Sequence, residues 1–325
     1  LRLKIQSIDE ALLKQNKRSK KDDWVRYIDI GTNFFQENNI NTTSKTKTFY
    51  LSDSLSNYAA DTVNKDDYQD TFIRTGAFKK LSDTSNINFN LGKTYTRQNN
   101  DKIKEKDLRS LFINYNTQFN KNFLSTYYSL NENNYIHEAD SVLHSLTLEN
   151  RYNLKPNQNI LISGNIGIAD YKTDIDFTTA DTKNNQSNGF AFGYEYFFTG
   201  LHHVKIKLGS NDYNARVDSN GYENNFKTIT YTNSFKSINL SLSRSINKNQ
   251  YDLADSFIQA NVIRDDEITT DTLSIYGNFN SLIKSYGLNF LKDIYYTYSH
   301  SKIKSESNIL NYDYNKDINK FGLTK

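Results

Sequence analysis

From residue 22 to the end of the chain, apolar and polar positions alternate with a period of two, which is typical of β-strands with one apolar face. In segment 189–198, one face carries only aromatic side chains: Phe190, Phe192, Tyr194, Tyr196 and Phe198. The opposite face is small or charged apart from Phe197. Segment 203–212 alternates in the same way after a short turn, so the two segments predict a β-hairpin.

The same alternation predicts fourteen strands along the chain. Their cores lie near 24–34, 71–81, 86–97, 107–119, 122–131, 141–154, 159–169, 188–198, 203–212, 225–234, 237–246, 269–281, 289–299 and 313–324. Short connections alternate with long polar ones, the long ones falling at 35–70, 98–106, 132–140, 170–187, 213–224, 247–268 and 300–312. Short turns on one side and long loops on the other are typical of an antiparallel transmembrane β-barrel in the bacterial outer membrane. The even strand number predicts that both ends of the barrel are periplasmic.

The first residues have a different pattern. Leu1, Leu3, Ile5, Ile8, Leu12 and Leu13 fall on one stripe of a helix, and a basic run follows it. We therefore expect a periplasmic helix at 1–21 and a β-barrel at 22–325.

Two soluble β architectures also give a period of two. A sandwich of fourteen long strands would have to be unusually large, and a solenoid should show a repeat of fixed length, which the sequence lacks. Barrel closure also pairs every strand edge, as lipid requires. The pattern therefore favours the membrane barrel.

Composition is consistent with this class. Aromatic residues make up 14% of the chain although its mean hydropathy is −0.75, and disordered chains contain few aromatics. The net charge of +3 gives no reason to expect a nucleic-acid partner, and the absence of cysteine excludes disulfides and thiol catalysis.

The sequence contains no phosphate-binding glycine loop, nucleophile elbow or metal-binding HExxH helix. We therefore expect no enzyme, no metal and no cofactor. The acidic run Asp265, Asp266 and Glu267 is interpreted as part of a solvated loop.

Five charged residues share the side of their strands that faces away from lipid: Glu149, Arg151, Glu195, Lys205 and Lys207. Opposite charges on neighbouring strands would pair along the lumen wall. These residues either line a conduit or are simply tolerated by a wet lumen, and the sequence favours neither interpretation.

Two motif-bearing segments carry a resemblance to a known family. The first barrel strand contains a Trp and leads into 31–41, Gly-Thr-Asn-Phe-Phe-Gln-Glu-Asn-Asn-Ile-Asn, and the chain ends with Ser307-Asn308-Ile309, Tyr312-Asp313-Tyr314-Asn315-Lys316 and 321–325, Phe-Gly-Leu-Thr-Lys. Residues 22–325 resemble the C-terminal outer-membrane barrel of the surface lipoprotein assembly modifier family, which joins a periplasmic tetratricopeptide region to a fourteen-stranded barrel. The resemblance implies that 1–21 is the last helix of such a region, and that the chain stops a few residues before the aromatic end usual in bacterial barrels.

The resemblance implies a barrel, expected to be a monomer in outer-membrane lipid, that helps a protein client such as a lipoprotein reach the cell surface. Such a client could pass a weakly closed seam between the first and last strands, for which Asp29, Gly31, Asp317 and Asn319 are candidate residues. The alternative is a passive porin or an exopolysaccharide-export barrel. A translocator predicts a lumen filled by loops, 35–70 among them, and an adhesive barrel would act through its long outer loops.

Overall fold

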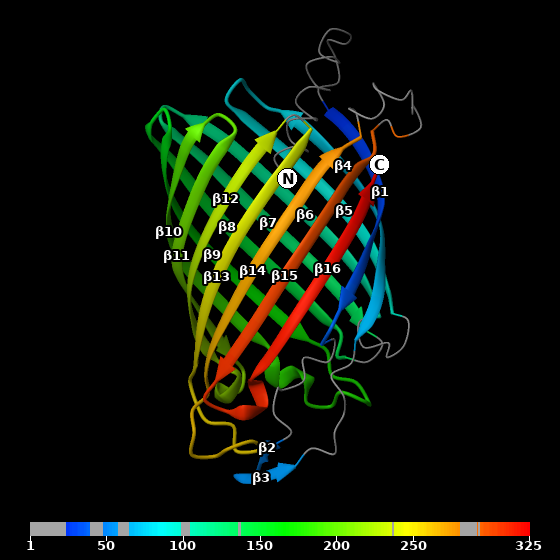
Figure 1. The fold of residues 1–325 in the computed structure, drawn as a ribbon, viewed down its shortest axis with the longest axis vertical. Helices are drawn as coiled ribbons and strands as arrows, with labels where there is room; N and C mark the ends of the chain where they lie inside the picture. The colour runs from blue at the N-terminus through cyan, green and yellow to red at the C-terminus, as the bar shows by residue number, and fades with distance from the viewer. Residues whose placement is uncertain are drawn as a thin grey trace.

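The structure is a computed structural model that describes residues 24–39, 48–57, 65–98, 105–135, 138–235, 237–279, 291 and 293–325. Fourteen antiparallel strands close into a barrel in which each strand pairs with its neighbours in the chain, and β1 pairs with β16 (Figure 1). Strands β2 (Thr48–Leu51) and β3 (Ser54–Asn57) form a separate hairpin. The predicted antiparallel barrel is confirmed. The helix expected at 1–21 lies outside the described residues.

The barrel strands are long, most of them spanning 14 residues. They are β1 (Trp24–Glu37), β4 (Asp66–Lys80), β5 (Ser85–Gln98), β6 (Lys106–Phe119), β7 (Asn122–Tyr135), β8 (Ser141–Lys155), β9 (Gln158–Tyr171), β10 (Asn185–Thr199), β11 (His202–Ala215), β12 (Tyr222–Phe235), β13 (Ile238–Tyr251), β14 (Asp265–Asn278), β15 (Tyr295–Ser307) and β16 (Tyr314–Thr324). In the connections that the structure describes, three short 3-10 helices occur: η1 (Ala180–Lys183), η2 (Asp218–Asn220) and η4 (Leu310–Tyr312).

The distribution of side chains is the reverse of that in a soluble protein. Among the described residues, the buried set contains five apolar residues and eighteen polar or charged ones. Large apolar side chains are exposed on the outer face, as Ile166 (59%) and Phe190 (59%) illustrate. Because soluble proteins bury apolar groups and pair the few polar groups inside, this arrangement fits a barrel with lipid outside and a polar lumen.

The two ends of the barrel differ in their connections. One end, called the short-turn end below, carries the tight turns 81–84, 120–121, 156–157 and 200–201, and both the start of β1 and the end of β16 lie there (Figure 1). The other end, the loop end, carries the longer connections, including 172–184 and 252–264. Short turns of bacterial barrels are periplasmic, so β1 starts and β16 ends on the periplasmic side of the outer membrane. No helix among the described residues is long and apolar enough to cross a membrane.

The strands extend further toward the loop end than the alternation predicts. The largest difference concerns β15, predicted at 289–299 and observed at Tyr295–Ser307. Its second half, from Ser301 to Ser307, is polar on both faces except for Ile303, so the period-two signal disappears although the backbone remains paired with β14 and β16.

Candidate functional site

The five charged residues expected in the lumen form two ion-paired clusters on the inner wall. One contains Arg151, Glu195 and Lys205, and the other contains Glu149 and Lys207. Glu195, 2% exposed, lies between Arg151 (Nε–Oε2 3.2 Å) and Lys205 (Nζ–Oε1 3.8 Å). It also accepts a hydrogen bond of 3.1 Å from Asn159 Nδ2. Three cations and two carboxylates leave the wall of β8–β11 slightly positive.

Small side chains allow these pairs to form across more than one strand. Lys205 and Glu195 are register partners on adjacent strands, but Arg151 reaches Glu195 over β9. Lys207 on β11 reaches Glu149 on β8 at 3.6 Å, past Gly193 and other small residues on the inner face of β10. Arg151 also lines a hollow of about 530 Å³ near the short-turn end, together with Asn159 and Phe197 among others.

The two segments that carry the family resemblance meet at the loop end. Glu37 and Lys316, 1% and 9% exposed, form an ion pair between β1 and β16. Next to it, Asn38 Nδ2 donates to Asp317 Oδ2 at 2.8 Å, and Asp317 N donates to Asn38 Oδ1 at 2.7 Å. Asn39 Nδ2 donates to the Asn315 carbonyl at 3.0 Å. Side chains 276 to 279 residues apart in the sequence thus connect β1 to β16.

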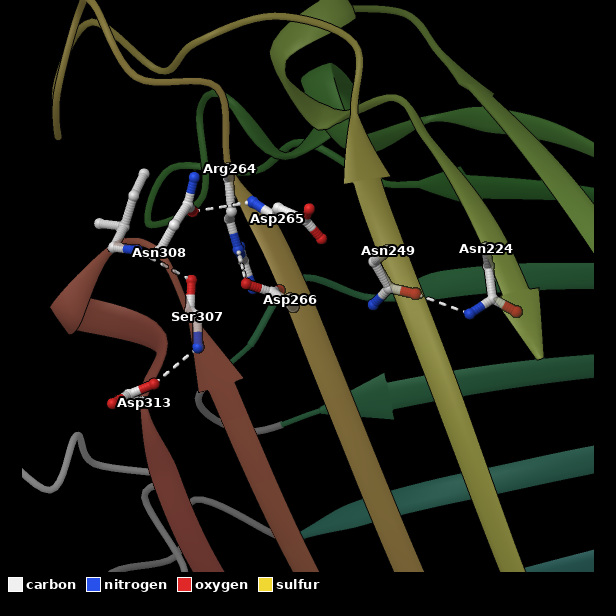
Figure 2. A network of polar contacts seen from close by, with 9 residues as sticks. Asn224, Asn249, Arg264, Asp265, Asp266, Ser307, Asn308 and Asp313 are labelled. Atoms are coloured by element: carbon white, nitrogen blue, oxygen red, sulfur yellow. Dashed lines mark hydrogen bonds and ion pairs between the residues drawn. The ribbon is translucent and has the colours of Figure 1, made fainter. Parts of the chain in front are cut away.

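The connection from β15 to β16 folds into a corner held by its own side chains (Figure 2). Ser307 N donates to Asp313 Oδ1 at 2.6 Å, and Ile309 N donates to Ser307 Oγ at 3.1 Å. Ile309 is 1% exposed and anchors the corner. Asn308 accepts a hydrogen bond from Asp265 N at 2.9 Å, which joins the corner to the start of β14.

Arg264 connects this corner to the neighbouring strands. Its guanidinium lies between the Tyr251 ring (4.4 Å) and the Tyr312 ring (3.3 Å). Its Nε donates to Asp266 Oδ1 at 3.0 Å, and Asp266 is fully buried. Tyr251 in turn packs on Tyr222 at 5.1 Å. Two residues nearer the short-turn end on the same two strands, Asn224 donates to Asn249 at 2.7 Å (Figure 2).

The acidic run 265–267 was misinterpreted as a solvated loop. It begins β14, and Asp266 points inward to its arginine. The inward position of Asp266 on the strand, two residues after an arginine, was the available signal, but the strand start could not be located in so polar a segment.

The β2–β3 hairpin lies beyond the loop end of the barrel (Figure 1). Tyr50 and Asn311 exchange two hydrogen bonds, 2.7 and 2.9 Å, and Ser52 N donates to the Phe257 carbonyl at 2.9 Å. Asp53 Oδ1 accepts from Ala260 N at 2.7 Å. The hairpin therefore covers two other loops and does not enter the lumen, whereas a lumen-filling 35–70 loop was expected for a translocator. Residues 40–47 and 58–64 lie outside the described part.

The four seam candidates lie in different surroundings. Gly31 pairs with Thr324 across the β1–β16 seam, and Asp317 bonds to Asn38 across it. Asn319 Oδ1 instead accepts a hydrogen bond of 2.8 Å from His300 Nδ1 on β15. Asp29 faces the lumen and pairs in register with Arg74 of β4.

Neither a protein-family model nor a curated protein sequence matches the chain. Several solved outer-membrane proteins share its fold. The loop L8 deletion mutant of OmpT from Vibrio cholerae is 8% identical, with a TM-score of 0.49 over 93% of this chain and 99% of that chain. The COG4313 outer membrane channel from Pseudomonas putida F1 is 12% identical, with a TM-score of 0.40 over 94% and 99%. OccK8 (OprE) from Pseudomonas aeruginosa is 8% identical, with a TM-score of 0.45 over 93% and 97%.

The prediction that the chain is not an enzyme is withdrawn in view of these matches. The matches to OmpT and to OccK8 (OprE) have identities of 8% and TM-scores below 0.5. A fold shared this widely does not imply one function, so it leaves enzymatic status undecided. The chain is an outer-membrane β-barrel with a polar lumen, the architecture of a channel.

Proposed function

We propose that this barrel helps to move surface lipoproteins, or other secreted proteins, across the outer membrane. The observation that carries the proposal is the meeting of the two motif segments, in their described residues 31–39 and 307–317, at the loop end of the β1–β16 seam. Those segments carry the resemblance to the surface lipoprotein assembly modifier family. Side-chain contacts such as that of Glu37 with Lys316 join the two motifs.

The seam is the proposed route of exit. At the loop end, polar side-chain contacts reinforce the backbone pairing of β1 and β16. From Gly31 to Gln36 the two strands are joined mainly by the backbone ladder. A client delivered on the periplasmic side by a helical region such as 1–21 would separate this part of the seam, while the loop-end contacts hold the strands in register.

A crosslink across the seam tests the proposed route. The chain has no cysteine, so the variants Gln36→Cys with Asn319→Cys join β1 to β16 through their outward register partners when treated with a short bifunctional thiol reagent. The matched control, Gln36→Cys with Asp67→Cys, joins β1 to β4. In cells, surface biotinylation followed by mass spectrometry reports which lipoproteins are exposed.

Deletion of the gene is expected to remove a subset of lipoproteins from the surface while leaving them in the cell, and the β1–β16 crosslink to do the same. Equal effects of both crosslinks would refute the seam as the route. An unchanged surface lipoprotein population after deletion would refute the function.

The second candidate is a channel for solutes or polysaccharides, and the position of the β2–β3 hairpin outside the lumen favours it. Single-channel conductance of the refolded chain separates the two. Large steady steps support the open channel, and a silent barrel that still supports lipoprotein exposure supports the translocator.

A further inference from the structure

The hollow of about 530 Å³ near the short-turn end lies on the inner face of the barrel wall. Gln118 on β6, Phe123 on β7 and Arg151 on β8 are successive register partners, and such partners point to the same side of a sheet. Arg151 belongs to an ion cluster of the inner wall, so all three side chains face the lumen. This space is called the mouth hollow below. Its lining includes Gln118, Phe123, Arg151, Asn153, Asn157 and Phe197.

Three amide side chains of the mouth hollow are not used by the fold. The side chains of Gln118, Asn153 and Asn157 form no hydrogen bond with any residue in the described part of the chain. Each amide presents two N–H donors and a carbonyl acceptor. Other amides of the inner wall pair with one another, as where Asn116 Nδ2 donates to Asn86 Oδ1 at 3.0 Å. The mouth hollow therefore offers a ligand both donors and acceptors.

Arg151 adds a positive charge to these amides. It contacts Glu195 through Nε, and its two terminal nitrogens donate a hydrogen bond to no described residue. Glu195 also contacts Lys205, so this cluster contains two cations and one carboxylate. Among the described residues that line the mouth hollow, none is acidic. Because a guanidinium presents paired N–H groups that match the two oxygens of a carboxylate, the mouth hollow favours an anionic ligand.

Two aromatic rings complete the mouth hollow. Phe123 and Phe197 are half-buried, and the ring of Phe197 is stacked on that of His203 at 5.1 Å. Contact with lipid does not explain these rings, because they lie on the inner face, which is polar in such barrels. An aromatic face packs against the C–H groups of a sugar ring, and the hydroxyl groups of a sugar both donate and accept, as the amides do. An acyl chain would cover the rings but leave the amides and Arg151 without partners, which is unfavourable.

The mouth hollow lies where the lumen meets the periplasm. The tight turns 156–157 and 200–201 contribute to its lining, and short turns of bacterial barrels are periplasmic. Its volume falls in the range of small-molecule sites, about 300–1,000 Å³. A chain that enters the lumen from the periplasm therefore meets this site first.

We propose that the mouth hollow binds an acidic saccharide. Its carboxylate pairs with Arg151, its ring faces pack on Phe123 and Phe197, and its hydroxyl groups bond to the amides. The inference names a ligand class for the channel that is the second candidate function, and it rests on that function only for the use of the site. Binding itself is measured without transport.

Equilibrium dialysis of the refolded full chain in detergent micelles tests the site. The acidic saccharide is tetragalacturonate, its neutral counterpart is maltotetraose, and the competing ligand class is represented by tetraglutamate, a peptide of similar charge. Heat-modifiable migration on SDS gels identifies the folded barrels. We expect tetragalacturonate to bind about ten-fold more tightly than either of the other two, because only it satisfies the guanidinium, the rings and the amides together.

Two variants locate the binding site. Arg151→Lys keeps the charge but loses the paired N–H groups, and Asn153→Ala removes an amide that the fold does not use, so each should weaken tetragalacturonate binding about five-fold. The matched control is Asn131→Ala, which removes an inner-face amide nearer the loop end of β7 and should leave the affinity unchanged.

The proposal is overturned if the folded wild-type barrel does not bind tetragalacturonate. Equal binding of maltotetraose would mean that the charge is not recognised, and equal binding of tetraglutamate would identify a peptide site; either result refutes an acidic-saccharide site. Wild-type affinity in both Arg151→Lys and Asn153→Ala, or an equal loss in Asn131→Ala, would place binding elsewhere. An unchanged surface lipoprotein population or a silent conductance trace refutes a proposed function but not the site, because the dialysis needs neither a client nor a current.

Discussion

Replacement of Arg264 by methionine is expected to destabilise the barrel by about 4 kcal/mol. Arg264 pairs with Asp266, which is fully buried, and its guanidinium lies between the rings of Tyr251 and Tyr312. Removal of one member of a buried ion pair costs about 3–5 kcal/mol because the other charge is left without compensation. The side chain of Arg264 is itself 24% exposed, so the lower end of that range applies. The two ring contacts add about 1 kcal/mol at this partly solvated rim.

A double-mutant cycle separates the charge from the packing. Asp266→Asn removes the buried charge, so Arg264→Met in that background should lose little more than the ring contacts. We therefore expect a coupling of about 2 kcal/mol or more between the two positions. Arg264→Lys keeps the positive charge but loses the planar fork, so it should fall between wild type and Arg264→Met.

The assay is urea unfolding of the barrel in phospholipid vesicles, followed by tryptophan emission. The chain has one tryptophan, Trp24, at the short-turn end and far from the corner, so its emission reports unfolding of the barrel and not a local change. An Arg264→Met variant within 1 kcal/mol of wild type, with an unchanged m-value, would refute the argument. It would mean that water reaches Asp266 and solvates it in place of the arginine.

Three further outcomes are expected. Glu195→Gln leaves Arg151 and Lys205 uncompensated, so the reversal potential in a KCl gradient should shift toward anion selectivity. The control Glu223→Gln, on the outward face of β12, should not shift the reversal potential. Equal shifts in the two variants would contradict a lumen position for Glu195. Asn38→Ala removes both side-chain hydrogen bonds to β16 and should cost about 1–3 kcal/mol, seen as a lower urea midpoint; a wild-type midpoint would mean that the seam does not depend on them. The Lys80 ammonium lowers the pKa of the Asp83 carboxyl, so any stabilisation from this pair is present above the unfolded pKa of about 3.9 and is lost as the pH falls through the folded pKa. Because Asp83 is fully exposed, Asp83→Asn should leave the urea midpoint unchanged. NMR of the wild type should show the Asp83 carboxyl titrating below its ordinary pKa.

The sequence predicts the barrel well where lipid acts on it. One face of each strand must be apolar within the bilayer, so segments such as 188–198 show the alternation and their facing follows from it. The inward facing of Glu195 and Lys205 follows from the same parity. Beyond the lipid both faces are polar, and the signal ends before the strand does. For this reason the loop-end half of β15 and the first four residues of β14 are missing from the predicted strands.

Contacts at the loop-end corner could not be predicted for a different reason. The strand order brings 31–39 close to 307–317, and the sequence contains both motifs, but alternation says nothing about which side chains pair. Asp266 pairs with Arg264, two residues away in the sequence, whereas Glu37 pairs with Lys316, 279 residues away in the sequence. Only the closure of β1 on β16 brings the second pair together.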